Sequence, residues 1–181
     1  MNHVAEVVAR NLIEGHRRRL RELVEAWQRA RDDWRRERDR ARNFLGRSVF
    51  RPNFPSFTVR GTNQALTQGL GSATNARRGT PAERARATAL QRALDQTYER
   101  FMRAEGELTQ FYTTATTTME QQIKERLDPY AESIARKQAR RLNVAREDVD
   151  DVITALKEEA SDLARRLAEG GRSRFRGMMG I

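Results

Sequence analysis

The apolar residues of this chain recur three and four positions apart over long stretches, and this spacing restricts the fold more than any other feature. Side chains spaced in this way lie along one narrow stripe of an α-helix, which is buried against other helices. Only Glu37 interrupts the first series, which consists of Leu20, Leu23, Trp27, Ala30, Trp34, Ala41 and Phe44.

The segment around this series predicts one long N-terminal helix over residues 2–45. It contains no Pro, and its only Gly is Gly15, where a short apolar segment at the N-terminus can separate from the rest. If the helix is continuous, it is ~65 Å long, because each residue adds about 1.5 Å.

Residues 46–79 have a different composition, with five Gly, two Pro and many small polar residues, and no sustained periodicity. Such a segment predicts an extended arm, with at most a short helical turn over residues 62–70. Phe50, Phe54 and Phe57 alternate with arginines in this arm. These rings can anchor the arm on a neighbouring subunit or stack on bases, and the sequence leaves both interpretations open.

The next helix has a clear start signal at Thr80. Thr80 and Glu83 have the spacing of a capping box, and Pro81 suits the first helical position. An apolar stripe then continues to about Leu127. The threonine-rich run at 113–118 is a weak point because β-branched residues are poorer helix formers, so residues 80–127 form either one helix or two.

The remaining sequence predicts two further helices and a tail. Asp128-Pro129 predicts the start of a helix over residues 129–142, and a last helix over residues 145–169 is expected to end at Gly170-Gly171. The predicted fold class is therefore all-α, in four successive parts: an Arg-rich long helix (1–45), an extended basic arm (46–79), a helical packing domain (80–169) and a basic tail (170–181).

Charge is distributed unevenly along the chain, which has a net charge of +10. Residues 1–82 hold 17 Arg and 8 acidic residues, whereas residues 83–169 hold 15 basic and 17 acidic residues. Between Asp39 and Glu83 there is no acidic residue at all. A GC-rich genome or a hot host would explain the preference for Arg over Lys, but it would not explain this segregation. The pattern indicates a folded body with basic parts that bind an anionic partner.

Arg is well suited to bind nucleic acid, since its planar guanidinium matches phosphate oxygens and stays charged. The sequence contains no zinc finger or RNP motif, so we expect contacts with phosphates rather than with bases. Trp27 and Trp34 lie on the apolar stripe and are expected in the core or in a subunit contact, with base stacking as the alternative. The predicted phosphate contacts are Arg17, Arg18, Arg21, Arg31, Arg35, Arg38, Arg42, Arg47 and Arg51.

Several other functions have little support in the sequence. There is no Cys, and His3 and His16 are the only histidines, so we expect no metal and no cofactor. No Gly-x-Ser-x-Gly motif is present, and residues 69–74 lack the Lys of a phosphate-binding loop. We therefore expect that the protein is not an enzyme. No apolar run approaches the ~20 residues that span a bilayer.

The arrangement resembles the major coat proteins of filamentous and rod-shaped archaeal double-stranded DNA viruses. In this resemblance, residues 1–79 correspond to a basic region that wraps DNA. The segments from Arg78 to Leu94 and from Leu108 to Ala115 correspond to the helical bundle, and the segment from Leu142 to Val149 begins its last helix. The resemblance implies a helical filament in the virion, assembled in the host cytoplasm from homo- or heterodimers, with DNA held in the A form.

The expected function is thus the packaging of double-stranded DNA in a helical nucleocapsid through sequence-independent Arg–phosphate contacts. With eight phosphates engaged, log K would fall with log[salt] at a slope of about −7, from about −0.9 per phosphate. Two alternatives remain open. One is a phage internal, ejection or coiled-coil adaptor protein that assembles without nucleic acid, and the other is a nucleoid-type DNA-binding protein.

Overall fold

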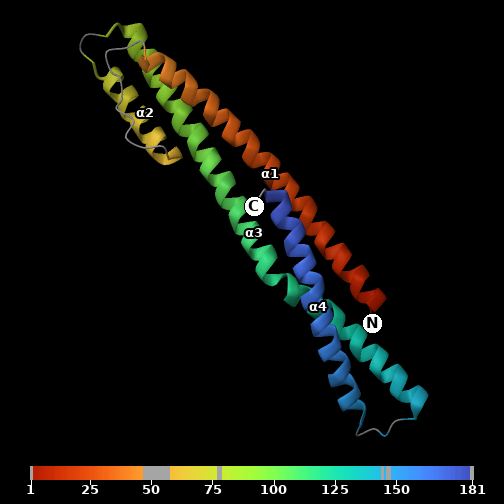
Figure 1. Ribbon diagram of the computed structural model, residues 1–181. Helices are drawn as coiled ribbons and strands as arrows, with labels where there is room; N and C mark the ends of the chain where they lie inside the picture. Colours follow the sequence, from red (N-terminus) through yellow and green to blue (C-terminus); the bar gives the residue numbers. More distant parts are fainter. Residues whose placement is uncertain (1, 47–57, 77–78, 144, 146–147, 180–181) are drawn as a thin grey trace. The chain divides into compact units, whose positions relative to one another are not determined.

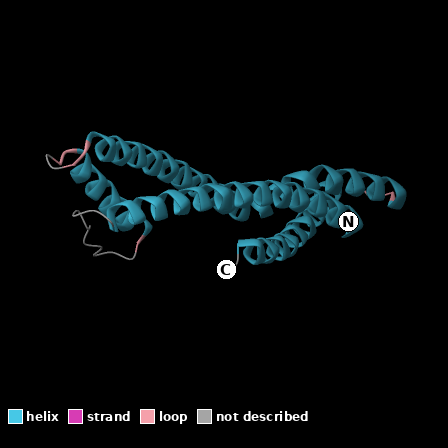
Figure 2. Cartoon of the chain, turned by 90° about the horizontal axis from the view of Figure 1, so that it is seen from above, coloured by secondary structure: helices cyan, strands magenta, loops and turns pink. Residues whose placement is uncertain are grey.

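The computed structural model describes residues 2–46, 58–76, 79–143, 145 and 148–179. These residues form four α-helices, and no strand is present among them (Figures 1 and 2). The all-α prediction is therefore confirmed. In chain order, the helices are α1 (Asn2–Gly46), α2 (Val59–Thr74), α3 (Pro81–Leu142) and α4 (Val149–Met179).

The helices form two compact units. The central unit is Leu23–Leu108, and the terminal unit combines Met1–Glu22 with Thr109–Ile181. Each unit contains three helical segments. The central unit takes the second part of α1, all of α2 and the first part of α3, and the terminal unit takes the other parts of α1 and α3 together with α4.

The core of the central unit is built around Trp34 of α1. Its ring stacks on Phe101 of α3, with 5.7 Å between ring centroids and 15° between planes. Its Nε1 donates a hydrogen bond of 3.1 Å to Oδ1 of the buried Asn63 of α2. Trp34 is 3% exposed, so it is a core residue and not a base-stacking platform. The buried cluster consists of Trp34, Ala41, Leu45, Leu66, Leu70, Ala87, Leu94 and Phe101.

Helix α2 corrects the prediction of an extended arm, which allowed at most a turn over residues 62–70. Thr58 caps this helix by accepting a hydrogen bond of 3.1 Å from the Gly61 amide. Leu66 and Leu70 are fully buried, and their contacts offset the low helix propensity of the glycines. Residues 47–57, including Phe50, Phe54 and Phe57, lie outside the described residues.

Helix α3 begins as predicted. The Glu83 amide donates to Thr80 Oγ1 (3.2 Å), and the Thr80 amide donates to Glu83 Oε2 (2.8 Å), which confirms the capping box. The hydrogen bonds from Thr80 lower the pKa of the Glu83 carboxyl. A carboxylate near the N-terminus of a helix also interacts favourably with the helix dipole.

The prediction of a separate helix over residues 129–142 was wrong, because α3 continues through Pro129. Pro129 lacks the amide proton that would bond to the carbonyl one turn earlier. Leu127 and Ala131 on either side of it are fully buried, and this packing holds the helix together. The threonine-rich run is also helical. Thr116 Oγ1, for example, donates to the Tyr112 carbonyl at 2.8 Å.

Helix α4 does not end at Gly170-Gly171 as predicted but continues to Met179. The side chain of Phe175 is fully buried, and this burial stabilises the last turns. Residues 172–179 thus belong to the helix and not to a basic tail.

The buried surface of the terminal unit consists largely of alanines at a spacing of four. Such small side chains allow close approach of helix backbones, and larger buried residues such as Ile123 and Leu127 fill the remaining space. The alanines are Ala5 and Ala9 of α1, Ala131, Ala135 and Ala139 of α3, and Ala160, Ala164 and Ala168 of α4.

The two adjacent glycines of α4 are expected to respond oppositely to substitution by Ala. A Cβ atom at Gly171 would lie 2.5 Å from Sδ of Met119 and 3.1 Å from two side-chain carbons of Ile13, whereas a Cβ atom at Gly170 meets nothing within 4 Å. Overpacking costs about 1–3 kcal/mol, and Ala gains about 1 kcal/mol of helix propensity over Gly.

We therefore expect Gly171→Ala to destabilise the protein by about 1 kcal/mol and Gly170→Ala to stabilise it by up to about 1 kcal/mol. Urea denaturation of both variants, followed by circular dichroism, tests this expectation. If the two substitutions change the free energy of unfolding by the same amount, Gly171 is not a site of close packing.

Candidate nucleic-acid interface

Most of the excess positive charge belongs to the central unit. Its sequence holds 17 Arg and 10 acidic residues, a net charge of +7. The terminal unit holds 18 basic and 15 acidic residues, a net charge of +3. The central unit is therefore the first place to look for an anion-binding surface.

Arg31, one of the predicted phosphate contacts, is engaged within its own helix. Its Cζ lies 4.6 Å from the centroid of the Trp27 ring, and its Nε lies 3.7 Å from Asp32 Oδ1. A guanidinium over an aromatic face is attracted by the ring quadrupole. Arg31 thus covers the outer side of a partly buried tryptophan, and only 31% of its side chain is exposed.

The same arrangement recurs seven residues later. Arg38 has its Cζ 5.5 Å from the Trp34 ring centroid, and its Nη2 lies 2.8 Å from Asp39 Oδ1. Seven residues are nearly two turns of helix, so both Trp–Arg pairs lie on one side of α1. Arg31 and Arg38 therefore stabilise the fold. Each also lies beside an acidic residue, Asp32 or Asp39, whose negative charge offsets that of the guanidinium.

Several other arginines of α1 form exposed ion pairs with acids three positions away. Arg17 Nη1 lies 3.5 Å from Glu14 Oε1, and Arg19 Nη1 lies 3.1 Å from Glu22 Oε2. Such pairs contribute less than about 1 kcal/mol each. These arginines can exchange their carboxylate for a phosphate at little cost in stability.

Three of the predicted contacts, Arg18, Arg21 and Arg35, are exposed and have no described carboxylate within ion-pair distance. Arg42 is also exposed on α1. Arg47 and Arg51 lie outside the described residues. The structure thus distinguishes the predicted arginines by their surroundings, and Arg35 is the clearest candidate in the central unit.

The central unit also exposes arginines that we did not predict as contacts. Arg100 could have been found from the sequence, since no acidic residue lies three or four positions from it. Arg29 could not have been found in this way. Glu25, Asp32 and Asp33 all lie three or four positions from Arg29, which is the spacing of ion pairs in a helix. The exposed arginines of this unit without a described carboxylate partner are Arg29, Arg35, Arg60, Arg86, Arg92, Arg100 and Arg103, of which Arg86 lies over the Phe44 ring.

His16, Glu132 and Lys157 make contacts within the terminal unit. His16 shares a hydrogen bond of 3.0 Å with Gln122, and its ring contacts Phe111. A hydrogen bond from Lys157 lowers the pKa of Glu132, and the pKa of Lys157 is raised by the same bond. Within the described parts of the chain, no group of three His, Cys, Asp or Glu residues could hold a metal ion.

Residues 69–74, which resemble part of a phosphate-binding loop, belong to α2 and not to a loop. None of the described helices has an apolar stretch long enough to cross a membrane.

These features define an all-α protein of two helical units, with excess arginine concentrated in the central one. Comparison of the chain with models of protein families, with curated proteins and with solved structures found no match. Its function must therefore be inferred from the arrangement of its own residues.

Proposed function

We propose that this protein is a structural protein that binds and packages double-stranded DNA through sequence-independent contacts between arginines and phosphates. The observation that carries the proposal is the net charge of +7 on the central unit, together with exposed arginines such as Arg29 and Arg35 that have no described carboxylate partner. Surplus guanidinium groups on a helical surface bind the backbone of a duplex without reading its sequence.

The position of the aromatic residues favours backbone binding over base stacking. Trp34 is buried, and Arg31 covers the Trp27 ring, so neither indole offers a free face on which a base could stack. Single-strand binders use exposed aromatic side chains for this purpose. The arrangement therefore favours a duplex over a single strand as the partner.

The larger biological setting is part of the same proposal. The protein would act in a virion, assembled in the host cytoplasm, as a nucleocapsid subunit that associates with copies of itself or with a related coat protein. The support for this setting is the combination of an all-α fold, a high Arg content and the resemblance to archaeal filamentous virus coat proteins. It requires no cofactor and no catalytic activity.

Binding to a labelled linear duplex at increasing NaCl concentrations tests the proposal. We expect log K to fall steeply with log[salt]. In the double variant Arg29→Ala/Arg35→Ala, the magnitude of the slope should decrease by about 2, from about 0.9 per phosphate contact. Fluorescence anisotropy gives both quantities.

Arg166→Ala is the matched control, since Arg166 is an exposed arginine on α4 with no described carboxylate partner. This variant should leave the slope unchanged. A wild-type slope near zero would sink the proposal. Regular oligomers that form without DNA and do not change when DNA is added would favour the alternative, an adaptor or ejection protein.

A further inference from the structure

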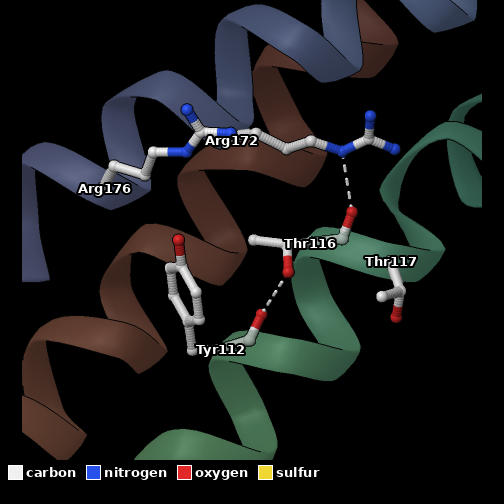
Figure 3. A pocket seen from close by; sticks show the side chains of 5 residues that line it. All are labelled: Tyr112, Thr116, Thr117, Arg172 and Arg176. Atoms are coloured by element: carbon white, nitrogen blue, oxygen red, sulfur yellow. Dashed lines mark hydrogen bonds between the residues drawn. The ribbon is translucent and has the colours of Figure 1, made fainter. Parts of the chain in front are cut away.

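The terminal unit contains a pocket between α3 and α4 that the proposed function does not use. Its volume is about 370 Å³, and it is lined by Tyr112, Thr116 and Thr117 of α3 and by Arg172 and Arg176 of α4. Figure 3 shows the Tyr112 hydroxyl directed from α3 towards α4, on the side where the Arg176 side chain lies. All five residues carry a polar group.

Several of these polar groups are already engaged. Arg172 Nε donates to the Thr116 carbonyl at 2.8 Å, and its Nη2 lies 3.6 Å from Glu120 Oε2. Thr116 Oγ1 donates to the Tyr112 carbonyl at 2.8 Å, and Thr117 Oγ1 donates to the Thr113 carbonyl at 2.8 Å. The bond from Arg172 joins the two walls of the pocket, and Figure 3 shows it together with the bond from Thr116 to the Tyr112 carbonyl.

Two donors in the pocket remain unused. The Arg176 guanidinium is exposed and has no ion pair or hydrogen bond with any described residue. The Tyr112 hydroxyl likewise has no partner among the described residues. Both groups can donate to a hydrogen-bond acceptor that enters the pocket, because a guanidinium has only donors and a phenol can donate one proton.

The charge of the pocket indicates that this acceptor is anionic. No carboxylate lines the pocket, and Arg172 and Arg176 are like charges four positions apart on one helix, a spacing that is destabilising. Glu120, which does not line the pocket, is shared between Arg172 and Arg165. An anion between α3 and α4 would relieve this repulsion.

We propose that this pocket binds a phosphate group, with Arg176 and the Tyr112 hydroxyl as its donors and Arg172 as a nearby positive charge. A tetrahedral oxyanion accepts several hydrogen bonds at once, and guanidinium matches its geometry. The site is independent of the proposed duplex contacts of the central unit. The phosphate can come from free inorganic phosphate or from a nucleic-acid backbone.

The experiment is a titration of the ¹⁵N-labelled full chain, followed through the Nε–Hε resonances of its arginines. One series adds inorganic phosphate at constant ionic strength, with chloride as the reference, and a second series adds a short duplex. We expect a saturable shift of the Arg176 resonance with phosphate and a Kd of about 1 mM or below. Arg176→Ala should weaken binding about tenfold and Tyr112→Phe about threefold, whereas Arg166→Ala should bind as wild type does.

The two series identify the source of the phosphate. If the duplex shifts the Arg176 resonance as phosphate does, the pocket is a second contact with nucleic acid, and if only phosphate does so, the ligand is the free ion. Both results support the site. A shift that does not saturate, or one that is equal in chloride, overturns the proposal, as does unchanged phosphate binding by a folded Arg176→Ala variant.

Discussion

Replacing Phe175 with Ala should lower the free energy of unfolding by about 3–5 kcal/mol, because the side chain is fully buried in the terminal unit. For a chain of this size, such a loss corresponds to a fall in Tm of roughly 10 °C. Thermal denaturation followed by circular dichroism measures it. The effect would be large for a residue in a segment that the sequence presents as a basic tail.

Arg174→Ala is the matched control, since Arg174 is exposed on the same turn of α4. We expect it to change stability by less than about 0.5 kcal/mol. If Phe175→Ala is as mild as this control, residues after Gly171 do not pack on the terminal unit, and α4 ends near the glycines.

Replacing Trp34 with Ala should also cost about 3–5 kcal/mol. The substitution removes the ring that stacks on Phe101 and leaves the buried Asn63 without its donor. Trp34→Phe keeps an aromatic ring but removes the N–H donor and part of the ring volume, and Trp27→Phe makes the same change of side chain at a position without the bond. We expect it to cost about 1–3 kcal/mol, the usual cost of one buried polar group without a partner.

Two further variants test the role of the hydrogen bond. Trp27→Phe should cost less than Trp34→Phe, since Trp27 Nε1 is buried and already lacks a partner. In the background of Trp34→Phe, the change Asn63→Leu should recover part of the lost stability, because both polar partners are then replaced by apolar groups. Equal costs for the two Trp→Phe variants, measured by urea denaturation, would show that the bond to Asn63 contributes nothing.

The parts of the fold that follow from local rules were predictable. The apolar spacing around Trp34 predicted a helix with this residue in the core, and the Thr80–Glu83 capping box predicted the start of α3. Both patterns involve residues that are only a few positions apart in the chain, so they do not depend on which other segments pack against them. The all-α class follows from the same local spacing.

The errors share one physical cause, which is that tertiary packing outweighs local propensity. Gly171 was expected to end a helix, but Phe175 is buried beyond it. Pro129 was expected to start a helix, but Leu127 and Ala131 are buried on either side. The glycines of α2 suggested an extended arm, but Leu66 and Leu70 bury its face. None of these contacts can be read from a single segment.

The sequence predicts that the candidate site is rich in arginine, but it does not predict which arginines are exposed without a carboxylate or aromatic neighbour. Arg18, Arg21 and Arg35 are exposed as expected, whereas Arg31 and Arg38 cover tryptophans. The ring under each of these two arginines lies four residues earlier, so the pairing is visible in the sequence once such cation–π contacts are considered.

Helices α1 and α2 run in the same direction (Figure 1). The hydrogen bond between Asn63 and Trp34 favours one position of α2 along α1. A shift of α2 by seven residues would bring Asn63 opposite Trp27, whose Nε1 has no partner. Such a shift would also move Leu66 and Leu70 of α2 away from Ala41 and towards Trp34. The larger side chain of Trp34 leaves no room for them. The hydrogen bond to Trp34 and the small side chain of Ala41 therefore both favour the observed register over one shifted by seven residues.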